Sequence, residues 1–240
     1  MAVQYRTQGF VLTKKDLLES DQVFDVFTKD FGKIKILGKA IRKINSKLRA
    51  GLDIFYLSEI EFVQGKAQKT LIDAIAVEKF KDIRNDLAKL AILQKIAESA
   101  DELIKGQEKD EKIWNLFLEA VDKLNQESGI RNQELIYYYF MWGLLSLLGY
   151  QIDLYHCVKC QEKLLPEIMN FSAEQRGIIC LRCSFDNIKD KIKISPEAIK
   201  LLRLIQAGGW PTLMKIKAEK GYLEELELIL SKIVSIIVLL

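Results

Sequence analysis

Apolar residues over the first 80 positions occur in short runs that turn-forming residues interrupt. Such runs, rich in β-branched and aromatic residues, predict strands near 4–13, 22–29, 33–39, 52–64 and 68–79. Five short strands in so few residues favour a small closed barrel, because closure leaves no exposed strand edge. A five-stranded OB-type barrel and an SH3-like barrel both fit this pattern.

From about residue 81 the apolar residues follow a period near 3.6, which predicts helices. One apolar stripe runs over 87–104 and a second over 114–124. Residues 134–149 are apolar on almost every side, which is typical of a helix at the centre of a bundle.

Two further helices are expected near the C-terminal end. Ser195 precedes Pro196, and this pair predicts a helix start, because serine caps free N–H groups and proline fits the first turn. Residues 222–239 form the closing helix. We therefore expect an α+β chain, with a small N-terminal β-barrel over 1–80 and a helical domain over 81–240.

Composition agrees with a folded protein, because 49% of the 240 residues are hydrophobic and 29% are charged. The formal net charge of +3 excludes a histone-like polycation. Neither a secretory signal nor an uncharged apolar stretch of membrane-spanning length is evident, so we expect a cytoplasmic protein. The apolar segment 233–240 is interpreted as part of a helix docked in the core, with a membrane-surface tail as the alternative.

Basic residues gather in the predicted barrel. The window 31–52 holds seven of them and no acidic residue, and two lysines of an adjacent turn can join the same surface. Such a surface is a candidate track for the phosphates of DNA, although many charge runs are only solvated faces. The nearby aromatic residues could stack on bases or fill the barrel core. The candidate DNA-binding residues are Lys14, Lys15, Lys33, Lys35, Lys39, Arg42, Lys43, Lys47 and Arg49.

All four cysteines fall in two pairs. Cys157 and Cys160 are separated by two residues, nineteen residues follow, and Cys180 and Cys183 repeat the spacing. Two such pairs supply four thiolates to one ion, which predicts a structural Zn²⁺ site in a module over 150–194. The alternatives are unliganded thiols or two disulfides, and disulfides are disfavoured in the cytoplasm.

The sequence gives little support for an enzyme. The sequence has no Gly-rich phosphate loop of the Walker or dinucleotide type, and we expect no small-molecule substrate. His156, the only histidine, adjoins Cys157, and a catalytic zinc would need an open coordination position that four cysteines leave no room for.

The order of these features resembles the RecO family of bacterial recombination mediators over nearly the whole chain. In the barrel the resemblance rests on Gly9-Phe10-Val11-Leu12, Glu19-Ser20-Asp21, Phe27-Thr28, Phe31-Gly32-Lys33, Lys39, Arg42, Ser46 and Lys47. Around the cysteines it rests on Phe140, Leu144, Leu145, Leu148, Gly149, Tyr150, Phe171 and Gly177. The chain departs from the family pattern at 15–19, at Ala40 and at Arg176.

The resemblance implies an OB-fold followed by a helical domain with an embedded four-cysteine zinc module. It also implies a non-enzymatic protein that binds single- and double-stranded DNA, anneals complementary strands and assists loading of RecA in DNA repair. The implied partners are RecR and the C-terminal tail of the single-strand-binding protein, with RecA an indirect partner, at the nucleoid during repair. Two other hypotheses stay open: a zinc-ribbon protein–protein adaptor with an incidental basic face, and a nuclease that uses carboxylates with no recognisable motif.

Overall fold

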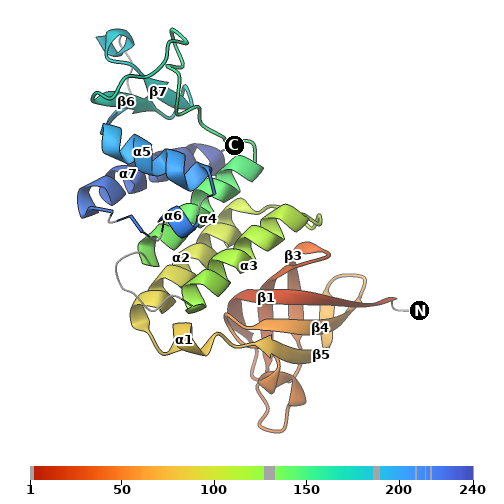
Figure 1. The fold of residues 1–240 in the computed structure, drawn as a ribbon. Helices are drawn as coiled ribbons and strands as arrows, with labels where there is room; N and C mark the ends of the chain where they lie inside the picture. The colour runs from red at the N-terminus through yellow and green to blue at the C-terminus, as the bar shows by residue number, and fades with distance from the viewer. Residues whose placement is uncertain are drawn as a thin grey trace. The chain divides into compact units, whose positions relative to one another are not determined.

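Five strands at the N-terminal end form a closed barrel in the order β1-β2-β3-β5-β4 (Figure 1). Neighbouring strands are antiparallel except β3 and β5, which pair in parallel through Ile36 with Lys69 and Leu37 with Thr70. The α+β class is thereby confirmed. The strands are β1 (Val3–Leu17), β2 (Asp21–Thr28), β3 (Gly32–Gly38), β4 (Leu57–Gln64) and β5 (Lys69–Glu78).

The computed structural model describes residues 3–126, 133–185, 190–208, 210–213, 215–216 and 218–239. The chain divides into two compact units, Met1–Gln126 and Glu127–Leu240. In the first unit the last strand ends at Glu78, and three helices follow it up to Gln126. No helix in the described part of the chain is long and apolar enough to cross a membrane.

Alternating side chains of the strands fill the barrel. The interior positions are apolar and almost wholly buried, as strand periodicity requires when one face of a sheet meets a core. They include Val11, Phe24, Val26, Ile34, Ile36, Ile60 and Phe62.

The fourth strand is shorter than the predicted strand over 52–64, which was wrong at its start. A turn occupies 53–56, because the Asp53 carboxylate accepts the Ile54 N–H at 2.8 Å and the Asp53 carbonyl accepts the Tyr56 N–H at 3.1 Å. Aspartate favours such local hydrogen bonds over a strand ladder. The 3-10 helix η1 (Lys47–Ala50) precedes this turn.

Three helices follow the barrel in the first unit: α1 (Lys81–Arg84), α2 (Leu87–Leu103) and α3 (Glu111–Gln126). Trp114 and Phe117 of α3 pack against aromatic rings on the outer face of the barrel. The ring centroids of Phe117 and Phe10 lie 4.9 Å apart, and those of Trp114 and Phe27 lie 5.4 Å apart. Helix α3 therefore covers the part of the β1–β2 surface that carries Phe10 and Phe27.

The second unit combines helices with a small sheet in the order β7-β6-β8. The predicted helix start at Ser195 is confirmed, because its hydroxyl accepts the Ala198 N–H at 3.2 Å. Residues 186–189 of the predicted zinc module lie outside the described residues. The elements are α4 (Gln133–Leu147), β6 (Met169–Ser172), β7 (Gly177–Ile179), η3 (Arg182–Phe185), β8 (Lys191–Ile194), α5 (Pro196–Gln206), α6 (Trp210–Leu213) and α7 (Lys220–Val238).

Candidate metal centre and nucleic-acid interface

The first cysteine pair lies in a tight turn that is anchored to β7. The Cys157 carbonyl accepts the Gln161 N–H at 2.9 Å, and the Val158 N–H donates to the Ile178 carbonyl at 2.9 Å. Gly177 permits this close approach, since a Cβ at its position would lie 2.0 Å from Cγ1 of Val158. The second pair follows β7 directly, so β7 brings both pairs to one place.

The four sulfur atoms form one cluster. All four Sγ atoms lie within 4.8 Å of one another, and the Sγ atoms of Cys160 and Cys180 are 3.8 Å apart. A tetrahedral zinc ion with Zn–S bonds of about 2.3 Å separates its sulfur ligands by about 3.8 Å. The four cysteines are free thiols, so the alternative of two disulfides is not what the structure contains. The donor set and its spacing fit a closed, four-thiolate zinc site.

The cysteines also differ in their surroundings. Burial by itself would raise the pKa of Cys157, but the N–H groups of Cys180, Cys160 and Lys159 stabilise its thiolate and lower the pKa to about 6. Hydrogen bonding with Cys180 raises the pKa of Cys183 to about 12. Four thiols this close cannot all ionise without a compensating charge, which a divalent cation supplies.

His156 does not join the sulfur cluster. Its Nδ1 lies 3.0 Å from the Asp153 carboxylate, and 49% of its side chain is exposed. Arg182, which lies between the last two cysteines, pairs with Glu162. The site therefore consists of the four cysteines and the amides around them.

Four of the nine predicted DNA-binding residues are paired with carboxylates of the first unit. Lys14 pairs with Asp53, Lys33 lies 2.9 Å from Asp101, Lys35 lies 3.6 Å from Asp25, and Arg42 lies 3.3 Å from Asp16. Lys35 keeps 69% of its side chain exposed, whereas only 21% of Lys33 is exposed. Lys33 is thus the candidate least able to reach a phosphate.

The other five candidates are exposed and have no carboxylate partner among the residues that the structure describes. Four of them lie between β3 and β4, in a segment that is held against the β1–β2 turn. The Arg42 N–H donates to the Ser20 carbonyl at 3.0 Å, and the Ala40 N–H donates to the Asp21 carboxylate at 2.7 Å. We call these five residues the free basic set: Lys15, Lys39, Lys43, Lys47 and Arg49.

The aromatic residues of the basic region belong mostly to the interior. Phe10, Phe24, Phe27 and Phe55 are buried, while Phe31 and Tyr56 are half-buried. Every aromatic side chain across 3–126 is buried or half-buried. The described part of the first unit therefore has no fully exposed aromatic ring on which a base could stack.

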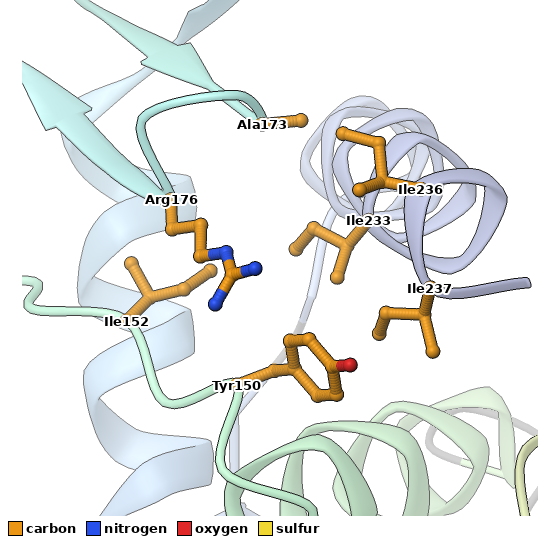
Figure 2. Close-up of a pocket in the computed structure, with 7 residues that line it drawn as sticks. All are labelled: Tyr150, Ile152, Ala173, Arg176, Ile233, Ile236 and Ile237. Carbon is orange, nitrogen blue, oxygen red and sulfur yellow. The ribbon is translucent and has the colours of Figure 1, made fainter. Parts of the chain in front are cut away.

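A narrow apolar pocket occurs in the second unit, and the sequence did not identify the residues that line it. Figure 2 shows Ile233 and Ile237 of α7 on the side of the Tyr150 ring, Ile236 nearer Ala173, and the Arg176 guanidinium beside Ile152 and Tyr150. That guanidinium lies 5.3 Å from the centre of the Tyr150 ring. No sequence signal links these residues, because they come together only through packing.

Comparison with known proteins gives one consistent result. Residues 1–80 match the family model "Recombination protein O N terminal", and residues 84–236 match "Recombination protein O C terminal". The chain is similar to "DNA repair protein RecO" of Dehalococcoides mccartyi strain 195, at 32% identity over 93% of this chain and 87% of that protein. The protein of the same name in Acetivibrio thermocellus is 30% identical over 92% of this chain and 86% of that protein.

Proposed function

The chain belongs to the RecO family of DNA repair proteins, and we propose that it is a non-enzymatic recombination mediator. In this role it binds single- and double-stranded DNA, anneals complementary strands and assists the loading of RecA. The observation that carries the proposal is the free basic set on a closed β-barrel.

The barrel is proposed to be an OB-fold. Its order β1-β2-β3-β5-β4, closed by a short parallel contact between β3 and β5, is that of a five-stranded Greek-key barrel. Barrels of this kind bind oligonucleotides along a strand face and its flanking loops. This supports DNA binding by the first unit.

Binding is expected to depend on charge rather than on sequence. Lysine and arginine side chains neutralise phosphates and release counterions, so affinity falls as salt rises. Five contacts on single-stranded DNA give a log–log slope of about −3.5. A basic surface also brings two strands together by reducing their mutual repulsion, which is what annealing requires.

The four cysteines are proposed to hold one structural Zn²⁺ ion. The sheet that they flank has strands of three and four residues, too short to be stable alone. A closed four-thiolate site contributes folding free energy and leaves no open position for chemistry. The metal is therefore proposed to stabilise the fold of the second unit.

The pocket in Figure 2 is the proposed site for the C-terminal tail of the single-strand-binding protein. Isoleucines of α7 offer apolar contacts, and Arg176 offers a charge to a carboxylate (Figure 2). RecR is the other proposed direct partner, RecA an indirect one, and the proposed location is the cytoplasm, at the nucleoid during repair.

A salt series tests the proposal against its two alternatives. Fluorescence anisotropy of a labelled single-stranded oligonucleotide, with zinc-loaded protein, is expected to give a slope of −3 to −4. The absence of binding at low salt would favour a zinc-ribbon adaptor with an incidental basic face. Metal-dependent cleavage of the strand would favour a nuclease.

A further inference from the structure

The outer face of the barrel is hollowed where the β4–β5 turn meets β2 and β3. The hollow has a volume of about 240 Å³, below the roughly 300–1,000 Å³ of drug-sized ligand sites and of the order of a single nucleobase. We call it the amide hollow, because Gln64, Gln68 and Gln107 line it.

Strand register explains its position. Val23 pairs with Leu37, and both side chains lie on the outer face, because their neighbours Phe24 and Ile36 fill the barrel core. The turn beyond β4 is closed by the Gly65 N–H, which donates to the Gln68 carbonyl at 2.9 Å. The loop that carries Gln107 is attached to the start of β3, where the Lys33 N–H donates to the Gly106 carbonyl at 3.3 Å.

Two lysines give the hollow a positive charge without a carboxylate in its lining. Lys69 Nζ donates to the side-chain amide oxygen Oε1 of Gln107 at 2.8 Å, so its charge is not neutralised by that contact. Lys35 is largely exposed beside it, in a long ion pair with Asp25 that contributes little. An anionic ligand is therefore attracted to this place.

The three side-chain amides offer both hydrogen-bond donors and acceptors, whereas a phosphate needs donors only. Gln107 keeps its amide N–H groups, since only its oxygen is engaged, and Gln64 keeps its oxygen, since its nitrogen donates to the Gly65 carbonyl. The Gln68 side chain has no hydrogen-bond partner among the described residues. Donors and acceptors side by side match the edge of a base, which presents both.

The floor suits the flat face of a base. Leu37 is only 7% exposed, so the half-buried Val23 supplies most of the apolar surface that a flat ring can cover here. Lys15 pairs with Val23 in the register of β1 and β2, so the same row of the sheet carries a member of the free basic set. Since every aromatic ring across 3–126 is buried or half-buried, this floor is one surface on which a base can lie.

We propose that the amide hollow binds one unstacked base of single-stranded DNA. The glutamine amides contact the base edge, Val23 and Leu37 contact its face, and Lys35 and Lys69 contact the adjoining phosphates. This inference rests on the proposed DNA-binding function and adds a contribution to affinity that depends on bases and not on charge.

The test uses two labelled strands of equal length, one with bases and one abasic throughout, so that their phosphate charge is the same. Wild-type protein is expected to bind the strand with bases at least about fivefold more tightly. The double substitution Gln64→Ala with Gln68→Ala is expected to reduce that preference below twofold and to leave the salt slope unchanged. The control substitution Gln94→Ala with Gln126→Ala removes two exposed amides elsewhere in the same unit and keeps the preference.

Two results would overturn the inference while leaving the proposed function intact. One is equal affinity of the wild-type protein for the two strands, and the other is a preference that survives the Gln64 and Gln68 substitutions. If neither strand binds at low salt, the proposed function fails and the inference fails with it.

Discussion

Replacing Cys157 with serine is expected to remove the metal and to destabilise the second unit even without metal. Cys157 is completely buried, whereas Cys183 is partly exposed, so Cys183→Ser is the matched comparison. Both substitutions remove one of four ligands. With free zinc at about 1,000 times its dissociation constant, wild-type protein gains about 4 kcal/mol from the metal, and both variants lose that gain.

A second contribution separates the two variants when a chelator has removed all zinc. The Cys157 sulfur accepts the Cys180 N–H at 3.4 Å. A serine oxygen on its shorter bond cannot reach the same donors, and a buried polar group that loses its hydrogen bonds costs about 1–3 kcal/mol. The Cys183 side chain reaches solvent, so Cys183→Ser is expected to cost little in chelator.

The assay combines zinc analysis after dialysis with urea unfolding, followed by circular dichroism with and without chelator. Hydrogen exchange of the amides in β6, β7 and β8 locates the loss. DNA affinity serves as an internal control, because the free basic set lies in the other unit. Wild-type stability that does not respond to chelator, or a Cys157→Ser protein that binds zinc one-to-one with wild-type affinity, would refute the reasoning.

Three other predictions concern charge, pH and packing. The triple substitution Lys39→Ala, Lys43→Ala and Lys47→Ala is expected to make the salt slope for single-stranded DNA shallower by about 2. The control replaces three other exposed lysines of the same unit, Lys81, Lys105 and Lys112, with alanine. It lowers the net charge equally and is expected to leave the slope near its wild-type value. Burial would raise the pKa of Asp190, but hydrogen bonds from the Glu174 N–H and the Ser172 hydroxyl outweigh burial and lower it. A depressed pKa stabilises the folded state at pH values above the unfolded pKa of about 3.9, and this stabilisation is lost as the pH falls below it. In urea unfolding, Asp190→Asn is therefore expected to destabilise the protein at pH 7 and much less at pH 3. An equal loss of stability at both pH values would count against this. Tyr138→Phe is expected to lower the free energy of unfolding by about 0.5–1.5 kcal/mol, because the hydroxyl donates to the Leu223 carbonyl at 3.1 Å; no change in urea unfolding would show that this bond is not stabilising.

The sequence was most informative where chemistry and spacing are local. Two residues between paired cysteines are enough to predict that all four sulfurs meet, and the structure brings them within 4.8 Å of one another. The serine and proline at 195–196 likewise predicted a helix start, because capping involves only neighbouring residues. The strand predicted from 52 failed for a similarly local reason, the turn made by Asp53.

Interactions between distant parts of the chain were beyond pattern analysis. The window 31–52 contains no acidic residue, yet Lys33 and Lys35 are paired with Asp101 and Asp25, from outside that window. The amide hollow depends on the parallel contact of β3 with β5, which places Gln64 and Gln68 beside Leu37. Charge counts along a sequence therefore identify a basic region but not which of its side chains are available.

Strand annealing tests the central claim most directly. Two complementary labelled oligonucleotides are mixed with zinc-loaded protein, without nucleotide cofactor, and duplex formation is followed over time by energy transfer. The account predicts that annealing is faster than without protein, that high salt abolishes the effect, and that the Lys39, Lys43 and Lys47 triple variant loses most of it. Strands that are bound with the expected salt dependence but anneal no faster than without protein would contradict the account.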